Sequence, residues 1–227
     1  MYGDNSTQSE LKQVSNVKNV PVYDLNYEQI VINNSYFLLV TKRLFDIFFS
    51  ILFGIITLPI MVLTALLIKL DSKGPIIYRQ KRVGLNDQEF WIYKFRSMSQ
   101  DAEANGAVWA QKKDPRVTTI GKFIRKTRID ELPQLYNVLK GEMSVIGPRP
   151  ERGIFIEEFT KEIPLFSIRT KVKPGLTGWA QVKGGYELTP GEKLEQDIYY
   201  MENRNLRMEI IILLLTVKVV SSGSGAR

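Results

Sequence analysis

The segment that most constrains this chain is a run of 22 residues without a charge, from Ile47 to Ile68. As one helix this run would be roughly 33 Å long, which is enough to cross a bilayer. A helix buried on every side in a domain of this size is the less favoured alternative. Pro59 stands near the middle of the run, where it removes a helix hydrogen bond and favours a kink. The sequence therefore predicts a membrane-inserted segment that is broken at Pro59.

Charges on both sides of this segment restrict its topology. Lys42 and Arg43 precede the run. The cations that follow it are Lys69, Lys73, Arg79, Lys81 and Arg82. Because positive flanks stay on the cytoplasmic side, a re-entrant hairpin over residues 41–72 agrees with this pattern, whereas a straight span does not. Kinked spanning helices are common, so the residues alone leave both topologies open.

The rest of the chain is predicted to contain short elements of mixed type. Residues 1–40 are expected to form a polar N-terminal extension that is partly disordered. Residues 75–97 mix β-branched, aromatic and basic side chains around a turn sequence, which predicts two strands. The apolar stretch at 208–220 is interrupted by charges and fits an amphipathic interfacial helix better than a span. We therefore expect an α+β fold that is mostly helical, with a small β element.

Composition narrows the chemistry. The chain contains neither histidine nor cysteine. This excludes Ser-His and Cys-His nucleophiles, imidazole acid-base catalysis, zinc sites and disulfides. A metal would have to be a hard ion held by oxygen ligands, with Mg²⁺ as the first choice. The net charge of +7 and the pI near 9.4 indicate anionic partners, such as nucleic acid, phospholipid or nucleotide.

The segment from Arg125 to Pro150 contains the best candidate for a reactive group. Asp130 and Glu131 stand side by side between a basic cluster and a short apolar helix. Asp130 taken alone is typical of an N-cap of that helix. A helix N-terminus also attracts phosphate through its N–H groups and its dipole, so the cap is compatible with a catalytic role. The cap leaves Glu131 and the surrounding cations unexplained.

The cations of this segment differ in what they indicate. Arg125, Lys126 and Arg128 form a run of charge, which by default is a solvated helix face. Next to a membrane segment, such a face could also lie on anionic headgroups. Arg149 is different, because prolines on both sides restrict its backbone and suit a guanidinium held for bidentate contact with phosphate. Carboxylates among fixed cations suit chemistry on phosphates.

Two further patterns are ambiguous. Lys94 and Arg96 alternate with aromatic residues along a predicted strand, and this basic face could meet a nucleotide or solvent. Asp197 and Tyr199 lie in a DIYY sequence, where tyrosines are more often core or membrane-interface residues.

Five blocks of the sequence, taken together, resemble the bacterial sugar transferase family, the monotopic polyprenyl-phosphate phosphoglycosyl transferases. The blocks are KRLFDIFFSILFGIITLPIMVLTALLIKLDSKGPIIYRQKRVG, WIYKFRSM, DPRVTTIGKFIRKTRIDELPQLYNVLKGEMSVIGPRP, VKPGLTGWAQV and DIYY. They occur in family order and cover about residues 40–227. The resemblance implies a monotopic membrane protein with a proline-broken re-entrant helix at 41–72. A cytoplasmic catalytic domain over 73–227 would end in an interfacial helix.

The same resemblance implies an enzyme on the cytoplasmic face of the bacterial inner membrane. Such enzymes transfer a sugar-1-phosphate from a UDP-sugar to undecaprenyl phosphate and release UMP. This is the first membrane step of exopolysaccharide, capsule or other surface glycan assembly. The expected partners are both substrates and anionic membrane lipid, without nucleic acid, and a homo-oligomer is left open.

Carried onto this chain, the family's catalytic pair falls on Asp130 and Glu131. Asp130 would attack the β-phosphorus and form an aspartyl phosphosugar intermediate. Glu131 would orient Asp130 or support a Mg²⁺ ion bound by both carboxylates. The residues expected to bind substrate are Lys94, Arg96, Arg125, Arg128, Arg149, Gln181, Asp197 and Tyr199.

Two positions depart from the family pattern. Many relatives place serine before the helix-breaking proline, whereas here Leu58 precedes Pro59 and Thr57 lies one residue further back. Many relatives also carry Asn-Gly-Arg after the GWAQV block, where this chain has Lys-Gly-Gly at 183–185. The second departure removes an arginine and its contact.

Two other hypotheses remain for the function. One is a Mg²⁺-dependent transferase that uses Asp130 as a metal ligand or base and forms no adduct. The other is a non-catalytic membrane scaffold of a glycan assembly complex. The sequence does not identify the donor sugar, the glycan pathway or the oligomeric state.

Overall fold

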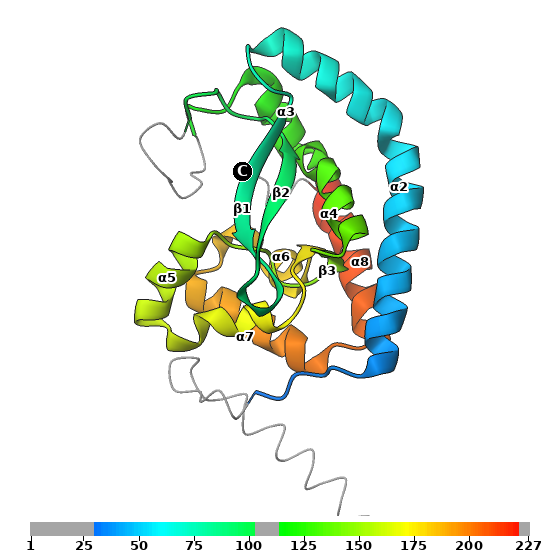
Figure 1. Ribbon diagram of the computed structural model, residues 1–227, viewed down its shortest axis with the longest axis vertical. Coiled ribbons are helices and arrows are strands. Elements are labelled where there is room, and N and C mark those ends of the chain that lie inside the picture. Colours follow the sequence, from blue (N-terminus) through cyan, green and yellow to red (C-terminus); the bar gives the residue numbers. More distant parts are fainter. Residues whose placement is uncertain (1–29, 103–113, 223–227) are drawn as a thin grey trace, which may run out of the picture.

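The computed structural model describes residues 30–102 and 114–222. Within these ranges the chain is mostly helical and has two small two-stranded sheets, which confirms the predicted α+β class (Figure 1). Most of the predicted N-terminal extension lies outside the described residues.

One helix, α2 (Tyr36–Asp71), contains the whole apolar segment. Among the described residues it is the one helix long and apolar enough to cross a membrane, and only 17% of its most apolar window is buried. Pro59 lies inside the helix, and Figure 1 shows that α2 is continuous but bends in its upper, cyan part. The structure therefore does not show the predicted separation into two helices, because a helix can continue across the one hydrogen bond that a proline removes. The Thr57 hydroxyl donates to the Phe53 carbonyl oxygen at 2.7 Å, a contact that also favours bending.

The two faces of α2 differ in polarity. The buried polar residues of its inner face are Asp46, Ser50, Thr57 and Thr64. Their spacing of four or seven residues places them on one side of the helix. Asp46 accepts hydrogen bonds from the Ser144 hydroxyl at 3.0 Å and from the Val145 N–H at 2.8 Å. The exposed outer face contains the large apolar residues Phe48, Ile51, Leu52, Ile55, Ile56, Leu58, Ile60, Val62, Leu63 and Leu66. This distribution is the reverse of a soluble amphipathic helix.

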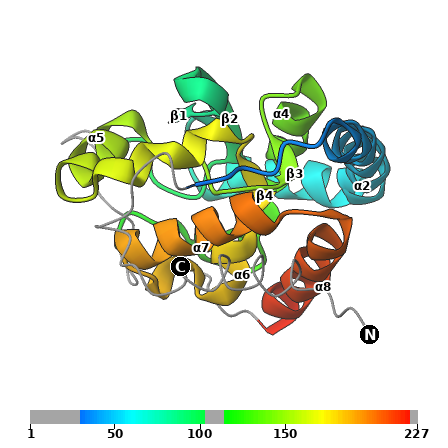
Figure 2. The ribbon, with the colours of Figure 1, turned by 90° about the horizontal axis from the view of Figure 1, so that it is seen from below.

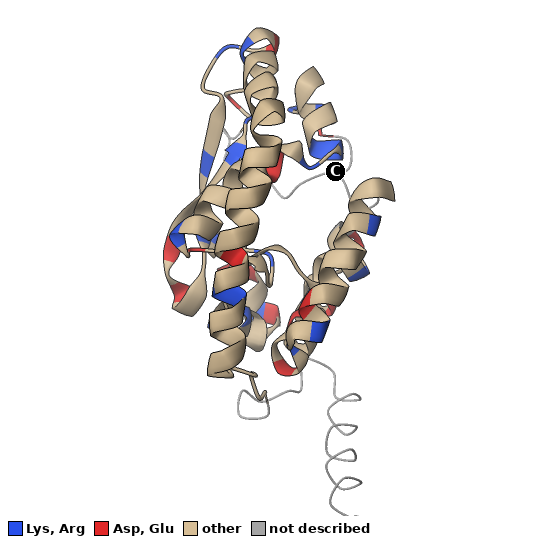
Figure 3. Ribbon diagram, turned by 90° about the vertical axis from the view of Figure 1, so that its right-hand side faces the viewer, with Lys and Arg blue, Asp and Glu red and all other residues tan. Residues whose placement is uncertain are grey.

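Both ends of α2 are fixed to the same body. Near its start, Arg43 donates to two carbonyl oxygens at the end of α4 (Leu135–Lys140), each at 2.7 Å. At its end, Asp71 accepts a hydrogen bond from the N–H of Ile120 in α3 (Thr119–Lys126), at 3.3 Å. The middle of α2 carries no charge, as Figure 3 shows.

The predicted strand pair is confirmed. β1 (Ile77–Val83) and β2 (Glu89–Phe95) form an antiparallel hairpin around the 3₁₀ helix η4 (Leu85–Asp87). A second, parallel pair consists of β3 (Ser144–Ile146) and β4 (Gly175–Thr177). The hairpin and the ends of β3 and β4 form the framework of the site described below.

Helices surround these sheets. The remaining elements are η5 (Ile129–Gln134), α5 (Gly153–Glu162), η6 (Pro164–Lys171), α6 (Trp179–Lys183), η7 (Gly185–Glu187), α7 (Pro190–Asn203) and α8 (Leu206–Ser222). Figure 2 shows β3 and β4 between α4 on one side and α6, α7 and α8 on the other. The core between them includes the fully buried residues Val138, Met143, Phe166, Leu194, Met201 and Ile212.

The helix expected at 208–220 is α8, and both its buried and its exposed faces contain apolar residues. Met208 and Ile212 are buried against the domain, whereas Leu214 and Val217 are exposed. Glu209, also buried, binds Lys42 at the start of α2. The polar contact joins α8 to α2 and leaves an apolar strip of α8 facing outward.

Candidate active site

The Asp-Glu pair lies in η5, directly before α4. The N-cap position of η5 belongs to Arg128, which has a left-handed backbone conformation with φ of 60°. The N-cap interpretation of Asp130 is therefore wrong, because Asp130 lies inside the first turn. Gly141 ends α4 in the left-handed conformation, as the sequence predicts.

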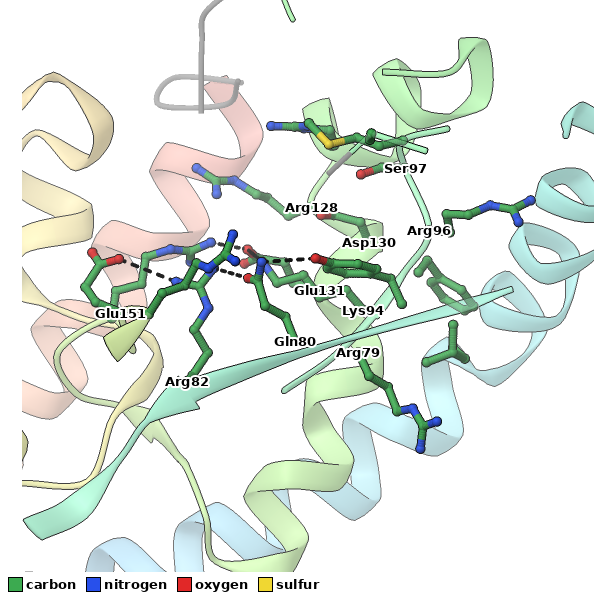
Figure 4. A pocket seen from close by; sticks show the side chains of 18 of the residues that line it. Arg79, Gln80, Arg82, Lys94, Arg96, Ser97, Arg128, Asp130, Glu131 and Glu151 are labelled. Carbon is green, nitrogen blue, oxygen red and sulfur yellow. Dashed lines mark hydrogen bonds and ion pairs between the residues drawn. The ribbon is translucent and has the colours of Figure 1, made fainter. Parts of the chain in front are cut away.

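Both carboxylates line a cavity of about 700 Å³. Its walls come mainly from β1, β2, η5 and the turn at 149–152, with further residues of α3, η6, α6, α7 and the connecting loops. The cations in these walls are Arg79, Arg82, Lys94, Arg96, Arg116, Arg125, Arg128, Arg149, Arg152, Arg169 and Lys193. Figure 4 shows the two acids among several of these side chains. So many cations around an open space make it a site for anions.

Glu131 is held by two cations. Its Oε1 accepts from Lys94 Nζ at 3.1 Å and from Arg149 Nη2 at 2.5 Å. Burial alone would raise the pKa of Glu131, but Arg149 and Lys94 hold that pKa well below its ordinary value. Glu131 is therefore a fixed, ionised carboxylate.

Asp130 and Glu131 are equally buried, with 8% of each residue exposed, but their carboxylates differ in their contacts. Its Oδ1 is buried and has no hydrogen-bond partner among the described residues. Burial and the neighbouring charge of Glu131 raise the pKa of Asp130 to about 6, although Lys94, Arg125 and Arg149 act against the rise. At neutral pH this carboxylate is mostly ionised and poorly satisfied, which is the condition of a reactive oxygen.

The family model for bacterial sugar transferases matches residues 37–223 of this chain. The chain belongs to the bacterial sugar transferase family. The match covers all but the first residue of α2 and the residues of the cationic cavity, so the long apolar helix and the site are parts of one family unit.

Three curated relatives illustrate the range of similarity. A UDP-N-acetylgalactosamine-undecaprenyl-phosphate N-acetylgalactosaminephosphotransferase of Aeromonas hydrophila is 48% identical over 82% of this chain and 45% of its own length. A putative undecaprenyl-phosphate N-acetylgalactosaminyl 1-phosphate transferase of Bacillus subtilis is 59% identical over 58% of this chain and 73% of its own. An exopolysaccharide production protein of Rhizobium leguminosarum is 41% identical over 79% of this chain and 94% of its own. The chain thus spans less than half of the Aeromonas protein and nearly all of the Rhizobium protein.

Four of the cations expected to bind substrate, Lys94, Arg125, Arg128 and Arg149, line the cavity together with the acids. Arg96 differs. Its guanidinium donates to the carbonyl oxygens of Ser72 at 2.7 Å and Lys73 at 2.9 Å, and Figure 4 shows it directed away from Asp130. These contacts satisfy carbonyls at the end of α2. The sequence suggested a shared face with Lys94, but β2 ends at Phe95 and the alternation ends with it.

The three predicted residues from the C-terminal part separate in the structure. Gln181 lines the cavity, and both polar atoms of its amide are buried without a hydrogen-bond partner in the described part of the chain. Asp197 is not in the cavity wall, since it forms a buried ion pair with Arg169 at 2.7 Å. Tyr199 is half-exposed and stacks on Trp179, with ring centroids 5.6 Å apart. Of these three, Gln181 alone is placed to contact a ligand in the cavity.

Sequence reasoning missed Glu151, Arg82, Arg169 and Lys193. All four line the cavity, and Glu151 forms ion pairs with the three cations. A signal was present, because Glu151 follows the Gly-Pro-Arg-Pro turn directly. Its cations come from distant parts of the sequence, so the signal could not be interpreted without the fold.

The oxygen ligands in the cavity determine how well the site fits Mg²⁺. Among residues 30–102 and 114–222, no group of three or more acidic side chains is arranged to hold a metal ion. The buried, unsatisfied Oδ1 of Asp130 nevertheless suits a hard cation that takes its other ligands from phosphate and water. Glu131 is less suited, because its Oε1 already accepts from two cations. The donor set fits a Mg²⁺ ion shared with a substrate rather than an all-protein cage.

Proposed function

We propose that this protein transfers a sugar-1-phosphate from a UDP-sugar to undecaprenyl phosphate and releases UMP. The observation that carries this proposal is the buried, unsatisfied carboxylate of Asp130 beside the fixed carboxylate of Glu131 in a cationic cavity. Family membership and the names of the relatives support the same reaction.

The reaction proceeds in two displacements. An ionised oxygen of Asp130 forms a bond to the β-phosphorus, and the bond from that phosphorus to the bridging oxygen breaks. UMP leaves with the electron pair, and the sugar-1-phosphate remains on Asp130. A phosphate oxygen of undecaprenyl phosphate then attacks the same phosphorus, and the bond to Asp130 breaks. The product is undecaprenyl diphosphosugar.

The neighbouring residues prepare Asp130 for this step. Glu131, held by Lys94 and Arg149, keeps a negative charge beside Asp130 and fixes two cations at the reacting centre. Arg125 and Arg128 bring further positive charge to the same cavity. Mg²⁺ at Asp130 would neutralise charge on the diphosphate of the donor. Pre-positioned cations of this kind stabilise the charge that develops on the leaving phosphate.

The direct test is the search for the adduct. Enzyme incubated with a UDP-sugar and quenched before acceptor is added should carry a phosphosugar on the peptide that contains Asp130. Asp130→Asn is the matched control and should carry none. Ping-pong kinetics should accompany the adduct, whereas intersecting initial-rate patterns would indicate direct transfer between bound substrates. Absence of UMP release with every donor, with undecaprenyl phosphate present, would favour a scaffold.

For the donor, we propose UDP-N-acetylgalactosamine as the first choice. The Aeromonas and Bacillus relatives are both named for N-acetylgalactosamine, at 48% and 59% identity. A panel of UDP-sugars assayed for UMP release tests this choice. A higher kcat/KM with a different sugar would overturn it.

We also propose that α2 lies in one leaflet of the inner membrane, on the cytoplasmic side. Its outer face is apolar, and contacts near both ends bind the same body, which contains the cationic cavity. A helix that crossed the bilayer would separate its ends by the full hydrocarbon thickness. The exposed strip of α8 suits contact with the same surface.

Cysteine labelling in cells tests this topology. Ser6→Cys and Ser224→Cys should both resist an impermeant thiol reagent added outside intact cells. Permeabilised cells provide the control, in which both should react. Labelling of one of the two positions from outside would mean that the chain crosses the membrane.

A further inference from the structure

A second buried carboxylate lies two residues after Arg149. Glu151 is 7% exposed, and its carboxylate contacts Arg82 at 3.4 Å, Lys193 at 3.2 Å and Arg169 at 3.7 Å. These cations belong to β1, α7 and η6 respectively. Figure 4 shows Glu151 and Arg82 on the side of the cavity away from Arg96. Three separate elements therefore converge on one acid.

Two of these cations also hold the backbone of the arginine turn. Arg169 Nη2 donates to the carbonyl oxygen of Arg149 at 3.0 Å. Arg82 Nη1 donates to the carbonyl oxygen of Pro150, also at 3.0 Å. Glu151 thus attracts the same guanidinium groups that fix the two residues before it in the chain.

The two ends of the turn are fixed by backbone hydrogen bonds. The carbonyl oxygen of Pro148 accepts from the N–H of Gly175 at 2.9 Å. The N–H of Val83 donates to the carbonyl oxygen of Glu151, also at 2.9 Å. Between these two anchors, the carbonyls of Arg149 and Pro150 depend on side chains. The position of the Arg149 guanidinium, 2.5 Å from Glu131, is thus set partly by Arg82 and Arg169.

The charges explain why the acid is needed. Arg82, Arg169 and Lys193 are largely buried, with 17%, 3% and 11% of their side chains exposed. Asp197 pairs with Arg169 at 2.7 Å, but Glu151 is the carboxylate that all three cations share. Buried cations that lose their counter-ion repel one another, and contact with another anion becomes favourable for them. The nearest consequence would be a shift of Arg82 and Arg169, and of the turn that they hold.

We infer that Glu151 is a positioning residue, which acts through Arg82 and Arg169 to hold Arg149 against Glu131. It does not take part in bond making. The inference rests on the proposed function for its kinetic consequence, but its structural content is independent of the reaction.

A double-mutant cycle tests the inference by kinetics. Glu151→Gln keeps the shape of the side chain and removes its charge, and Arg149→Lys weakens the contact that Glu151 is inferred to position. We expect Glu151→Gln alone to lower kcat for UMP release about 10- to 100-fold, with KM for the donor changed less than about threefold. If Glu151 acts through Arg149, kcat of the double variant should lie within about threefold of kcat of Arg149→Lys alone. The inference would be overturned if the loss of kcat in the double variant equals the product of the two single losses. A wild-type kcat in folded Glu151→Gln would overturn it as well.

The chain offers a matched control and a second route. Glu89→Gln makes the same chemical change at an exposed ion pair with Lys81, and kcat should stay at the wild-type value. If Glu151→Gln does not fold, Arg82→Gln removes the donor to Pro150 while Glu151 keeps Lys193. The cycle of Arg82→Gln with Arg149→Lys should show the same lack of additivity, and multiplied effects would again overturn the inference.

Structures of the wild type and the variant separate this inference from the proposed function. In Glu151→Gln, or in Arg82→Gln if that variant replaces it, Arg149 should no longer lie within hydrogen-bond distance of Glu131. A contact retained at the wild-type distance would overturn the inference, whatever the activity. If the wild type releases no UMP from any donor, the proposed function fails, and this structural comparison still decides the role of Glu151.

Discussion

The molecule contains two buried acidic centres that share one cavity wall and differ in how completely they are paired. At the first centre, Glu131 binds two cations while Asp130 Oδ1 has no hydrogen-bond partner in the described chain. At the second, Glu151 contacts three cations. The same residue types therefore support different tasks. A carboxylate that is paired with several cations holds the structure in place. A carboxylate oxygen without a hydrogen-bond partner can still contact a ligand.

The largest expected effect comes from Asp130, the less completely paired carboxylate of the first centre. Asp130→Asn keeps the size of the side chain but removes the nucleophile, so kcat for UMP release should fall about 10³-fold or more. Steady-state UMP release from the best donor measures this, with thermal unfolding as the check that the variant folds. A loss of less than about tenfold would contradict the contrast between the two centres.

The next effect concerns the cation that the two centres have in common. Arg149 binds Glu131 by its side chain and accepts from Arg169 by its carbonyl oxygen. Arg149→Gln should lower kcat about 100-fold, because a fixed charge at the reacting phosphate is lost. Lys81→Gln, at a side chain that is 57% exposed on β1, is the control and should leave kcat unchanged. Equal effects of both substitutions would mean that net charge, rather than position, matters.

Dependence on pH should distinguish the two centres directly. Asp130 can attack only when ionised, and its pKa is raised to about 6, so the rate is full above this pH and is lost as pH falls through it. Below the pKa, kcat/KM for the donor should fall about tenfold per pH unit. Burial would raise the pKa of Glu151, but Lys193 and Arg169 hold that pKa below its ordinary value, so it should add no inflection above pH 5. A profile measured from pH 4.5 to 8 that is flat through pH 6 would contradict the assignment of Asp130.

The smallest effect tests whether unsatisfied atoms mark ligand contacts elsewhere in the cavity. The amide of Gln181 is buried without a partner in the described chain, as Asp130 Oδ1 is. Gln181→Ala should raise KM for the UDP-sugar about five- to tenfold and leave kcat within about twofold, since a binding contact remote from the reacting phosphorus is lost. A KM for the UDP-sugar equal to that of the wild type would mean that the unsatisfied amide of Gln181 does not mark a ligand contact.

Much of the fold could be predicted from local patterns. The charge-free run predicted a helical membrane segment, and the structure forms one long apolar helix there; alternation with a turn sequence predicted the β1–β2 hairpin. Helical spacing and Gly141 predicted α4 and its end. The re-entrant hairpin stays a prediction, since α2 continues through Pro59 as one bent helix whose inner face contacts the domain on both sides of the proline. The strand expected to include Arg96 ends one residue earlier, at Phe95, so Arg96 does not share the face of Lys94.

The sequence by itself determined the kinds of groups that this protein can use. Without histidine or cysteine, an Asp-Glu pair among cations was the best candidate for a reaction centre, and the apolar run predicted a position at a membrane. The tertiary structure alone decided which acid is paired and which is not. It also brought Arg82, Arg169 and Lys193 to Glu151 from three elements. Burial and charge pairing set the state of a carboxylate, and both depend on residues that only the folded chain brings together.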